Sequence, residues 1–264
     1  MVSSSSNDLS HRGIGRFMSV LRLVAASQTD GLRVAEVAAE LELSYTTTHR
    51  ILDGLLAEQA VEKSPDGKRY CIGHEISLLG LARTGHFPLK FLSMDSMQRI
   101  RSAFGETCYL TVRSKFDSVC IHRELGTHAR KVMSIDVGSR RPMGVVVGSV
   151  AYLAAMPEHL ANEIIRINVH RYPYYHLSET EVLEHVNWAR KNRYAYAKSG
   201  LRPGTRSVSA VIEDSTGRPL AALSVVAVVD RFPAERCDEI STILIREGKT
   251  IGRLWQERSI SVRS

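Results

Sequence analysis

The chain has 264 residues, 44% hydrophobic and 24% charged, an ordinary composition for a globular protein of one or two domains. No stretch approaches the roughly 18 uninterrupted apolar residues of a membrane-spanning helix. The Ser-rich start lacks the apolar core of a signal peptide. We therefore expect a cytoplasmic protein with no membrane partner and with a disordered tail over residues 1–10.

The net charge of +7 is unevenly distributed along the chain. Residues 1–75 hold 8 lysines and arginines against 10 aspartates and glutamates, whereas residues 76–264 hold 27 against 18. A basic balance is the usual electrostatic mark of nucleic-acid binding. Because the first 75 residues are slightly acidic, a nucleic-acid site there has to be argued from local pattern.

Residues 11–74 are expected to form a small domain of three helices and a hairpin. A first helix over 12–26 is followed by a second over 34–41, whose apolar residues at 34, 37, 38 and 41 form an amphipathic stripe. Three residues then lead to a third helix, for which Ser44 is a good N-cap. This tight connection predicts a helix-turn-helix. The inward face of the third helix would be Thr48, Ile51, Leu52, Leu55 and Leu56.

A basic hairpin should complete this domain as a winged helix. Residues 60–63 and 68–72 are strand-like, and Pro65-Asp66-Gly67 between them is a turn sequence. The N-terminal end of the third helix would reach DNA bases and the wing would reach phosphates. The alternative is a winged helix that docks protein. The candidate DNA-binding residues are Arg33, Ser44, Tyr45, Thr46, Thr47, His49, Arg50, Lys63, Lys68 and Arg69.

A linker helix is expected over residues 75–91, interrupted at Gly85–Pro88, and an α+β domain over residues 92–264. Strands followed by helices and then strands again predict an antiparallel or mixed sheet covered by helices. Ser178 and Glu181 form a capping box. The expected helices are 89–104, 148–155, 158–168, 179–192 and 234–255, and the expected strands are 107–113, 119–124, 131–137, 194–198, 207–214 and 221–228.

Signatures of catalysis and of metal binding are missing from the sequence. Four scattered cysteines, Cys71, Cys108, Cys120 and Cys237, form no C-x-x-C pair and are expected to be buried thiols. No nucleophile elbow, phosphate loop or metal-ligand spacing of histidines is present. We expect no catalytic residue, metal or cofactor, and hence no enzyme. A small-molecule-binding or enzymatic domain carrying a protein-docking winged helix is kept as the alternative.

Several motifs resemble the IclR family of bacterial regulators. They are Val37-Ala38-Ala39-Glu40-Leu41, Thr47-Thr48-His49-Arg50-Ile51-Leu52, the wing ending Tyr70-Cys71-Ile72-Gly73, Gly105-Glu106-Thr107, Arg141-Pro142-Met143 and the strand around Pro219–Val225. The resemblance spans nearly the whole chain. It implies an N-terminal winged helix-turn-helix followed by a C-terminal α/β effector-binding and oligomerisation domain, a GAF/profilin-like sheet with helices.

The resemblance also implies partners and a ligand pocket. The partners are a double-stranded DNA operator, a small-molecule effector and further copies of the chain, as a homodimer or a dimer of dimers. The protein would be a repressor or an activator, and we expect a catabolic operon as its target. Carried over by position, the effector-binding residues are Val147, Gly148, Ala197, Ser207, Ser224 and Val226, with Met143 and Ser149 beside them.

Three of these positions depart from the pattern of family members that bind small oxo acids. Ala197 stands at a carboxylate position, Ser207 at a cysteine position and Val226 at one of two serine positions. The backbone amides of Gly148 and Ser149 could still form a seat for a carboxylate at a helix start. We hypothesise a small organic acid with an aromatic or otherwise hydrophobic body. The alternative is that the apolar positions simply belong to the core.

Overall fold

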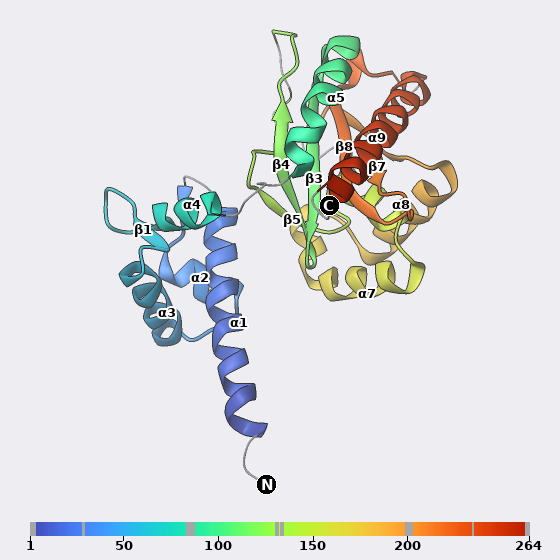
Figure 1. The fold of residues 1–264 in the computed structure, drawn as a ribbon. Coiled ribbons are helices and arrows are strands. Elements are labelled where there is room, and N and C mark those ends of the chain that lie inside the picture. Colours follow the sequence, from blue (N-terminus) through green and yellow to red (C-terminus); the bar gives the residue numbers. More distant parts are fainter. Residues whose placement is uncertain are drawn as a thin grey trace. The chain divides into compact units, whose positions relative to one another are not determined.

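The computed structural model describes residues 4–27, 30–82, 88–129, 132, 135–198, 203–233 and 235–261. The chain divides into two compact units, residues 1–86 and 87–264. Each unit is described by itself (Figure 1). Among the described residues, no helix combines the length and the apolar character needed to cross a membrane.

The N-terminal unit is a winged helix-turn-helix. Its helices enclose a core in which Val20, Val37 and Leu52 are fully buried. Apolar residues at helical spacing build this core, so the amphipathic pattern of the sequence is confirmed here. The elements are α1 (Ser4–Ala26), α2 (Val34–Glu40), α3 (Tyr45–Ala57), β1 (Val61–Lys63), β2 (Tyr70–Ile72) and α4 (His74–Leu81).

Both ends of this unit differ from the sequence-based expectation. Helix α1 begins at Ser4, within the expected disordered tail, and residues 1–3 lie outside the described residues. The expected linker helix over 75–91 is not one helix. The range 75–91 contains most of α4 and the first residues of a later helix that begins at Pro88. Residues 83–87 lie outside the described residues. Proline at the first helical position explains the new start.

The C-terminal unit is an α+β domain built on one six-stranded sheet. Its strands are ordered β5-β4-β3-β8-β7-β6, and every neighbouring pair is antiparallel. The elements are α5 (Pro88–Phe104), β3 (Thr107–Ser114), β4 (Asp117–Glu124), β5 (Arg140–Pro142), α6 (Val147–Ala154), α7 (Glu158–Asn168), η2 (Val169–Tyr175), α8 (Glu179–Asn192), β6 (Ala195–Ala197), β7 (Thr205–Glu213), β8 (Pro219–Val228), η3 (Val229–Arg231) and α9 (Arg236–Ser261).

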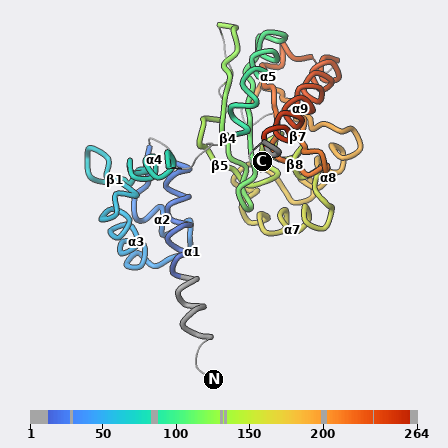
Figure 2. Tube along the Cα trace, viewed as in Figure 1, coloured from blue at the N-terminus to red at the C-terminus, as the bar shows by residue number. Residues whose placement is uncertain are grey.

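Helices cover the two faces of this sheet differently. Helices α5 and α9 lie side by side on one face (Figure 1), where they bury Leu110, Val208 and Leu223. Helix α6 packs on the opposite face and against α8. Strands β3 and β8 are far apart in sequence but adjacent in the sheet (Figure 2). Since side chains alternate along a strand, neighbouring residues of β3, β7 and β8 face different surroundings.

One expected strand is wrong and one helical segment was not expected. None of the described residues between 131 and 137 is in a strand, and residues 131, 133 and 134 lie outside the described residues. Buried Val132 packs against Tyr109, Cys120 and Val226, so the apolar pattern there reflects packing and not strand pairing. The edge strand beside β4 is β5. Segment η2 continues α7 directly and leads towards α8.

Candidate functional sites

The start of α3 presents a polar face of the N-terminal unit. Tyr45, Thr46, His49 and Arg50 are all exposed, as their positions in the sequence predicted. The rings of Tyr45 and His49 are 6.2 Å apart, and His49 Nδ1 lies 2.7 Å from Asp53 Oδ2. These contacts hold the histidine along the helix. Two neighbouring turns of α3 therefore carry a phenol, an imidazole, a hydroxyl and a guanidinium.

Ser44 and Thr47 serve the helix itself. The Ser44 hydroxyl accepts the backbone N–H of Thr47 at 3.2 Å and donates to the Thr47 hydroxyl at 2.8 Å. The predicted N-cap is therefore confirmed. The Thr48 hydroxyl donates to the Ser44 carbonyl at 3.1 Å from within the core. Capping fixes where α3 begins, and with it the position of the exposed face.

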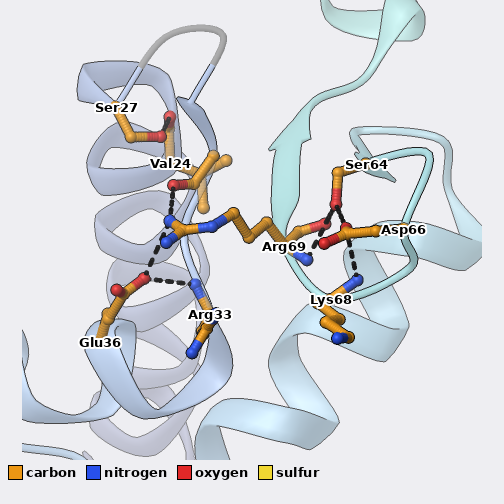
Figure 3. A network of polar contacts seen from close by, with 9 residues as sticks. Val24, Ser27, Arg33, Glu36, Ser64, Asp66, Lys68 and Arg69 are labelled. Atoms are coloured by element: carbon orange, nitrogen blue, oxygen red, sulfur yellow. Dashed lines mark hydrogen bonds and ion pairs between the residues drawn. The ribbon is translucent and has the colours of Figure 1, made fainter.

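The wing is tied to α2 by Arg69. Its Nη1 donates to the Gly31 carbonyl at 3.0 Å and lies 3.4 Å from Glu36 Oε2 (Figure 3). Glu36 Oε2 also accepts the backbone N–H of Arg33 at 2.7 Å. The guanidinium of Arg69, expected to contact phosphate, is thus largely engaged within the domain. The Arg33 side chain is exposed beside it.

A hydrogen-bonded turn shapes the wing tip. Asp66 Oδ1 accepts the Ser64 hydroxyl at 2.6 Å and the Lys68 amide at 3.1 Å, and the Ser64 hydroxyl accepts the Arg69 amide at 3.0 Å (Figure 3). The Ser64 hydrogen bond, then the Lys68 amide, lower the pKa of Asp66. Lys63 and Lys68 are exposed, and Lys63 Nζ lies 5.6 Å from the Tyr70 ring centroid. The turn therefore fixes the end of the hairpin, where Lys63 ends β1 and Lys68 follows the turn.

The C-terminal unit contains a pocket of about 750 Å³ between the sheet, α6 and α8. Its floor is formed by side chains of β3, β7 and β8 that point away from the α5–α9 core. All six residues carried over by position line this one pocket, namely Val147, Gly148, Ala197, Ser207, Ser224 and Val226.

The start of α6 meets a group of hydroxyls in this pocket. A Cβ on Gly148 would lie 2.6 Å from the Thr111 hydroxyl and 3.0 Å from that of Ser224, so only glycine allows this approach. Within the described part of the chain, no acceptor is recorded for the amides of Val147 and Gly148, as expected for the first turn of a helix. The two amides and the Thr111 hydroxyl thus face the cavity, whereas the Ser224 hydroxyl donates to Ser209 Oγ at 3.0 Å.

The other two expected pocket residues lie behind its wall. Met143 and Ser149 are each 1% exposed and do not line the cavity. The Ser149 amide donates to the Val146 carbonyl at 2.9 Å, and its hydroxyl accepts the Gly144 N–H at 2.9 Å. The expectation that the Ser149 amide forms part of a carboxylate seat is therefore wrong, because that amide already has an acceptor inside the helix start.

Sequence reasoning missed a whole wall of the pocket. Tyr174, Tyr175 and His176 come from the end of η2 and the turn after it, Glu181 and His185 from α8, and Tyr196 and Lys198 from β6 and its end. In the sequence, the run Tyr174-Tyr175-His176-Leu177 directly before the capping box was the signal that could have indicated this wall. The buried Tyr172, whose hydroxyl donates to the Met143 carbonyl at 2.9 Å, anchors this wall.

Glu181 is occupied by the capping box of α8. Its Oε2 accepts the Ser178 amide at 2.8 Å and the Ser178 hydroxyl at 2.7 Å, and its own amide donates back to that hydroxyl at 3.3 Å. The Ser178 hydrogen bonds, and the nearby His185 to a smaller extent, lower the pKa of Glu181. The predicted capping box is confirmed. Among the described residues, no group of three or more His, Cys, Asp or Glu side chains is placed to hold a metal ion.

Comparison with known proteins identifies both units. The family model described as "Bacterial transcriptional regulator IclR C-terminal" matches residues 84–253, and the "IclR helix-turn-helix domain" matches residues 13–65. The "Transcriptional repressor IclR" of Escherichia coli (strain K12) is 23% identical over 244 residues, covering 91% of this chain and 88% of that protein.

Two solved structures share the fold. An IclR family transcriptional regulator from Brucella abortus has a TM-score of 0.73 at 19% identity, covering 91% of each chain. An IclR homolog from Microbacterium hydrocarbonoxydans, solved in complex with 4-hydroxybenzoate, has a TM-score of 0.62 at 21% identity, covering 90% of this chain and 99% of the other.

Proposed function

This chain belongs to the IclR family, DNA-binding transcriptional regulators with a C-terminal effector-binding domain, and from that premise we propose that its effector is an aromatic carboxylic acid. The observation that carries the proposal is the pocket, where the amides of the α6 start and the hydroxyl of Thr111 lie in a cavity that tyrosine side chains also line. Backbone amides at a helix start bind carboxylates well, and tyrosine rings pack on an aromatic body.

The target is proposed to be an operon for the breakdown of that acid, with the chain acting as its repressor or activator and not as an enzyme. The complex of a relative with 4-hydroxybenzoate supports this class of effector. The effector would act through its different affinities for the DNA-competent and DNA-incompetent arrangements of the protein.

The DNA contacts are proposed to come from two elements of the N-terminal unit. Tyr45, Thr46, His49 and Arg50 at the start of α3 would reach base edges, because they are exposed at the end of the helix that enters the major groove in this motif. Lys63 and Lys68 on the wing, together with Arg33, would bind phosphate oxygens. Ser44 and Thr47 hold the helix, and Arg69 holds the wing.

A second copy of the chain is proposed to cover the apolar surface of α4. Leu78, Leu79 and Leu81 are 52%, 61% and 66% exposed, and no residue of this helix is buried. Exposed leucines gathered on one short helix are typical of an interface. A two-fold dimer would then present two winged helices to a pseudo-palindromic operator.

Arg50→Ala is expected to weaken operator binding by about 5- to 160-fold for each half-site, because a bidentate arginine–guanine contact contributes roughly 1–3 kcal/mol. Gel shifts on the DNA upstream of the chain's own gene and its neighbours would measure the effect. Sedimentation of the complex should give two chains per operator. Affinity should also fall steeply as salt rises.

Arg253→Ala is the control for this experiment, since Arg253 lies on α9 with a 71% exposed side chain. It should leave DNA binding unchanged. If the wild-type chain shifts no fragment at low salt, the DNA contacts proposed here are wrong and the protein-docking alternative for the winged helix gains support.

Benzoate and its para-substituted derivatives are expected to bind the full chain with measurable heat, whereas glyoxylate and pyruvate are not. Two-carbon and three-carbon oxo acids would leave most of the roughly 750 Å³ pocket unfilled. Isothermal titration calorimetry compares the two sets directly. Binding of the oxo acids without binding of any aromatic acid would contradict the proposed effector class.

A further inference from the structure

The wall formed by α8 and the end of β6 gathers cationic and hydrogen-bonding groups on the pocket. Lys198 follows β6, His185 lies in the second turn of α8, and His176 directly precedes α8. All three side chains are exposed and line the cavity. None of them belongs to the patch of amides and hydroxyls at the α6 start.

The strand register separates this wall from the α6 start. Ser224 touches the α6 start, and Ser207 pairs with Val226, two residues further along β8. Ala197 in turn pairs with Ser207, so Lys198 lies one residue beyond that level and two strands away from β8. With about 3.3 Å per residue and about 4.8 Å between strands, the Cα atoms of Ser224 and Lys198 are about 14 Å apart. Because the lysine side chain is long and flexible, its ammonium group can lie closer to Ser224 than its Cα does. The remaining distance is about the length of an aromatic ring with a substituent at each end.

The charge of this wall favours an anion. Glu181 is the one carboxylate among the described residues that line the cavity, and its Oε2 already accepts two hydrogen bonds from Ser178. Those bonds hold the carboxylate at the start of α8. Among the described residues that line the cavity, Lys198, His176 and His185 therefore stand against a single carboxylate, which is already engaged.

We infer that the effector is an aromatic acid with a second acidic group at the far end of the ring, an aromatic dicarboxylate. This inference rests on the proposed function, which supplies the first carboxylate at the α6 start. The second carboxylate binds Lys198 and His185, with His176 beside them. Tyr174 and Tyr175, which line the cavity, enclose the ring between the two ends.

Trp188 lies three residues after His185 on α8 and serves as the reporter for occupancy of this pocket. Its ring lies 6.4 Å from that of Tyr196, which lines the cavity, and makes an edge contact with Tyr194 at 5.1 Å. The chain contains two tryptophans, so the variant Trp255→Phe leaves Trp188 as the single reporter. Titration of this variant, with calorimetry of the wild-type chain, gives two independent affinities.

The test compares benzene-1,4-dicarboxylate with 4-methylbenzoate, which has a similar size but an apolar far end. The dicarboxylate is expected to bind at least about tenfold more tightly, because hydrogen bonds between charged groups are the stronger ones. Lys198→Met should remove this preference and leave the affinity for 4-methylbenzoate within about twofold. The control Lys115→Met changes an exposed lysine of the β3–β4 turn, outside the pocket lining, and should alter neither affinity.

Each outcome separates the inference from the proposed function. Equal affinities for the two acids, or a preference that survives Lys198→Met, overturn the second acid site while aromatic-acid binding stands. Binding of 4-hydroxybenzoate as tight as that of the dicarboxylate also overturns it, because a neutral hydroxyl would then suffice. Absence of binding by every aromatic acid overturns both.

Discussion

Arg231→Met is expected to lower the free energy of unfolding of the C-terminal unit by about 3–5 kcal/mol, the usual result when one partner of a buried ion pair is removed. The Glu106 side chain is only 6% exposed. Its two oxygens accept hydrogen bonds from Arg231 Nε at 2.5 Å and Nη2 at 3.0 Å. These bonds raise the pKa of Arg231. Methionine keeps much of the volume of the arginine side chain but carries no charge. The buried Glu106 carboxylate would then have only the His128 ring nitrogen, at 3.4 Å, in place of the guanidinium.

Urea unfolding followed by tryptophan fluorescence would measure this loss. The matched control is Arg253→Met, which removes an exposed pair with Glu257 at 4.0 Å. An exposed pair contributes about 0–1 kcal/mol, so this variant should unfold almost as the wild type does. Equal effects of the two substitutions would show that the Glu106–Arg231 pair does not support the domain.

Gly73→Ala is expected to destabilise the N-terminal unit by about 3 kcal/mol, at the upper end of the usual cost of overpacking. Gly73 joins the wing to α4, and its amide donates to the Ala60 carbonyl at 3.0 Å. Its backbone conformation suits any residue, so the cost is steric. An added Cβ would collide with the carbonyl of Gln59, a backbone group that cannot rotate away.

Gly80→Ala is the matched control in the same unit. Gly80 lies within α4, and no atom lies within 4 Å of the position of its added Cβ. Because alanine is the better helix former by about 1 kcal/mol, this variant should be neutral or more stable. Thermal unfolding followed by circular dichroism distinguishes the stabilities of the two variants. Similar stabilities would mean that the wing tolerates a shift at Gly73.

Local signals in the sequence located the helices well. The expected helices over 158–168 and 179–192 coincide with α7 and α8, because a proline N-cap position and a capping box mark their first residues. The exposed face at the start of α3 was likewise readable from one helix and its cap. The short edge strand β5 was not readable, since its pairing with β4 depends on a loop whose apolar residues pack elsewhere.

The pocket was predictable only in part, for a similar reason. Positions on strands and at the α6 start could be carried over from the family pattern, and they do line one cavity. The wall with His176, His185 and Lys198 depends on how η2 and α8 fold back over the sheet, which no local pattern encodes. The engagement of Arg69 with Gly31 and Glu36 also arises from a contact between residues distant in sequence.

The alternation of side chains along β3, β7 and β8 separates stability from recognition within the same strands. Leu110, Val208 and Leu223 belong to the α5–α9 core, whereas Ser207 and Ser224, on the opposite face, line the pocket. A lineage of such proteins can therefore acquire a new inducer through successive single changes on the pocket face, each of which leaves the packed face intact. This division makes the domain readily adaptable in evolution and a practical scaffold for engineered biosensors.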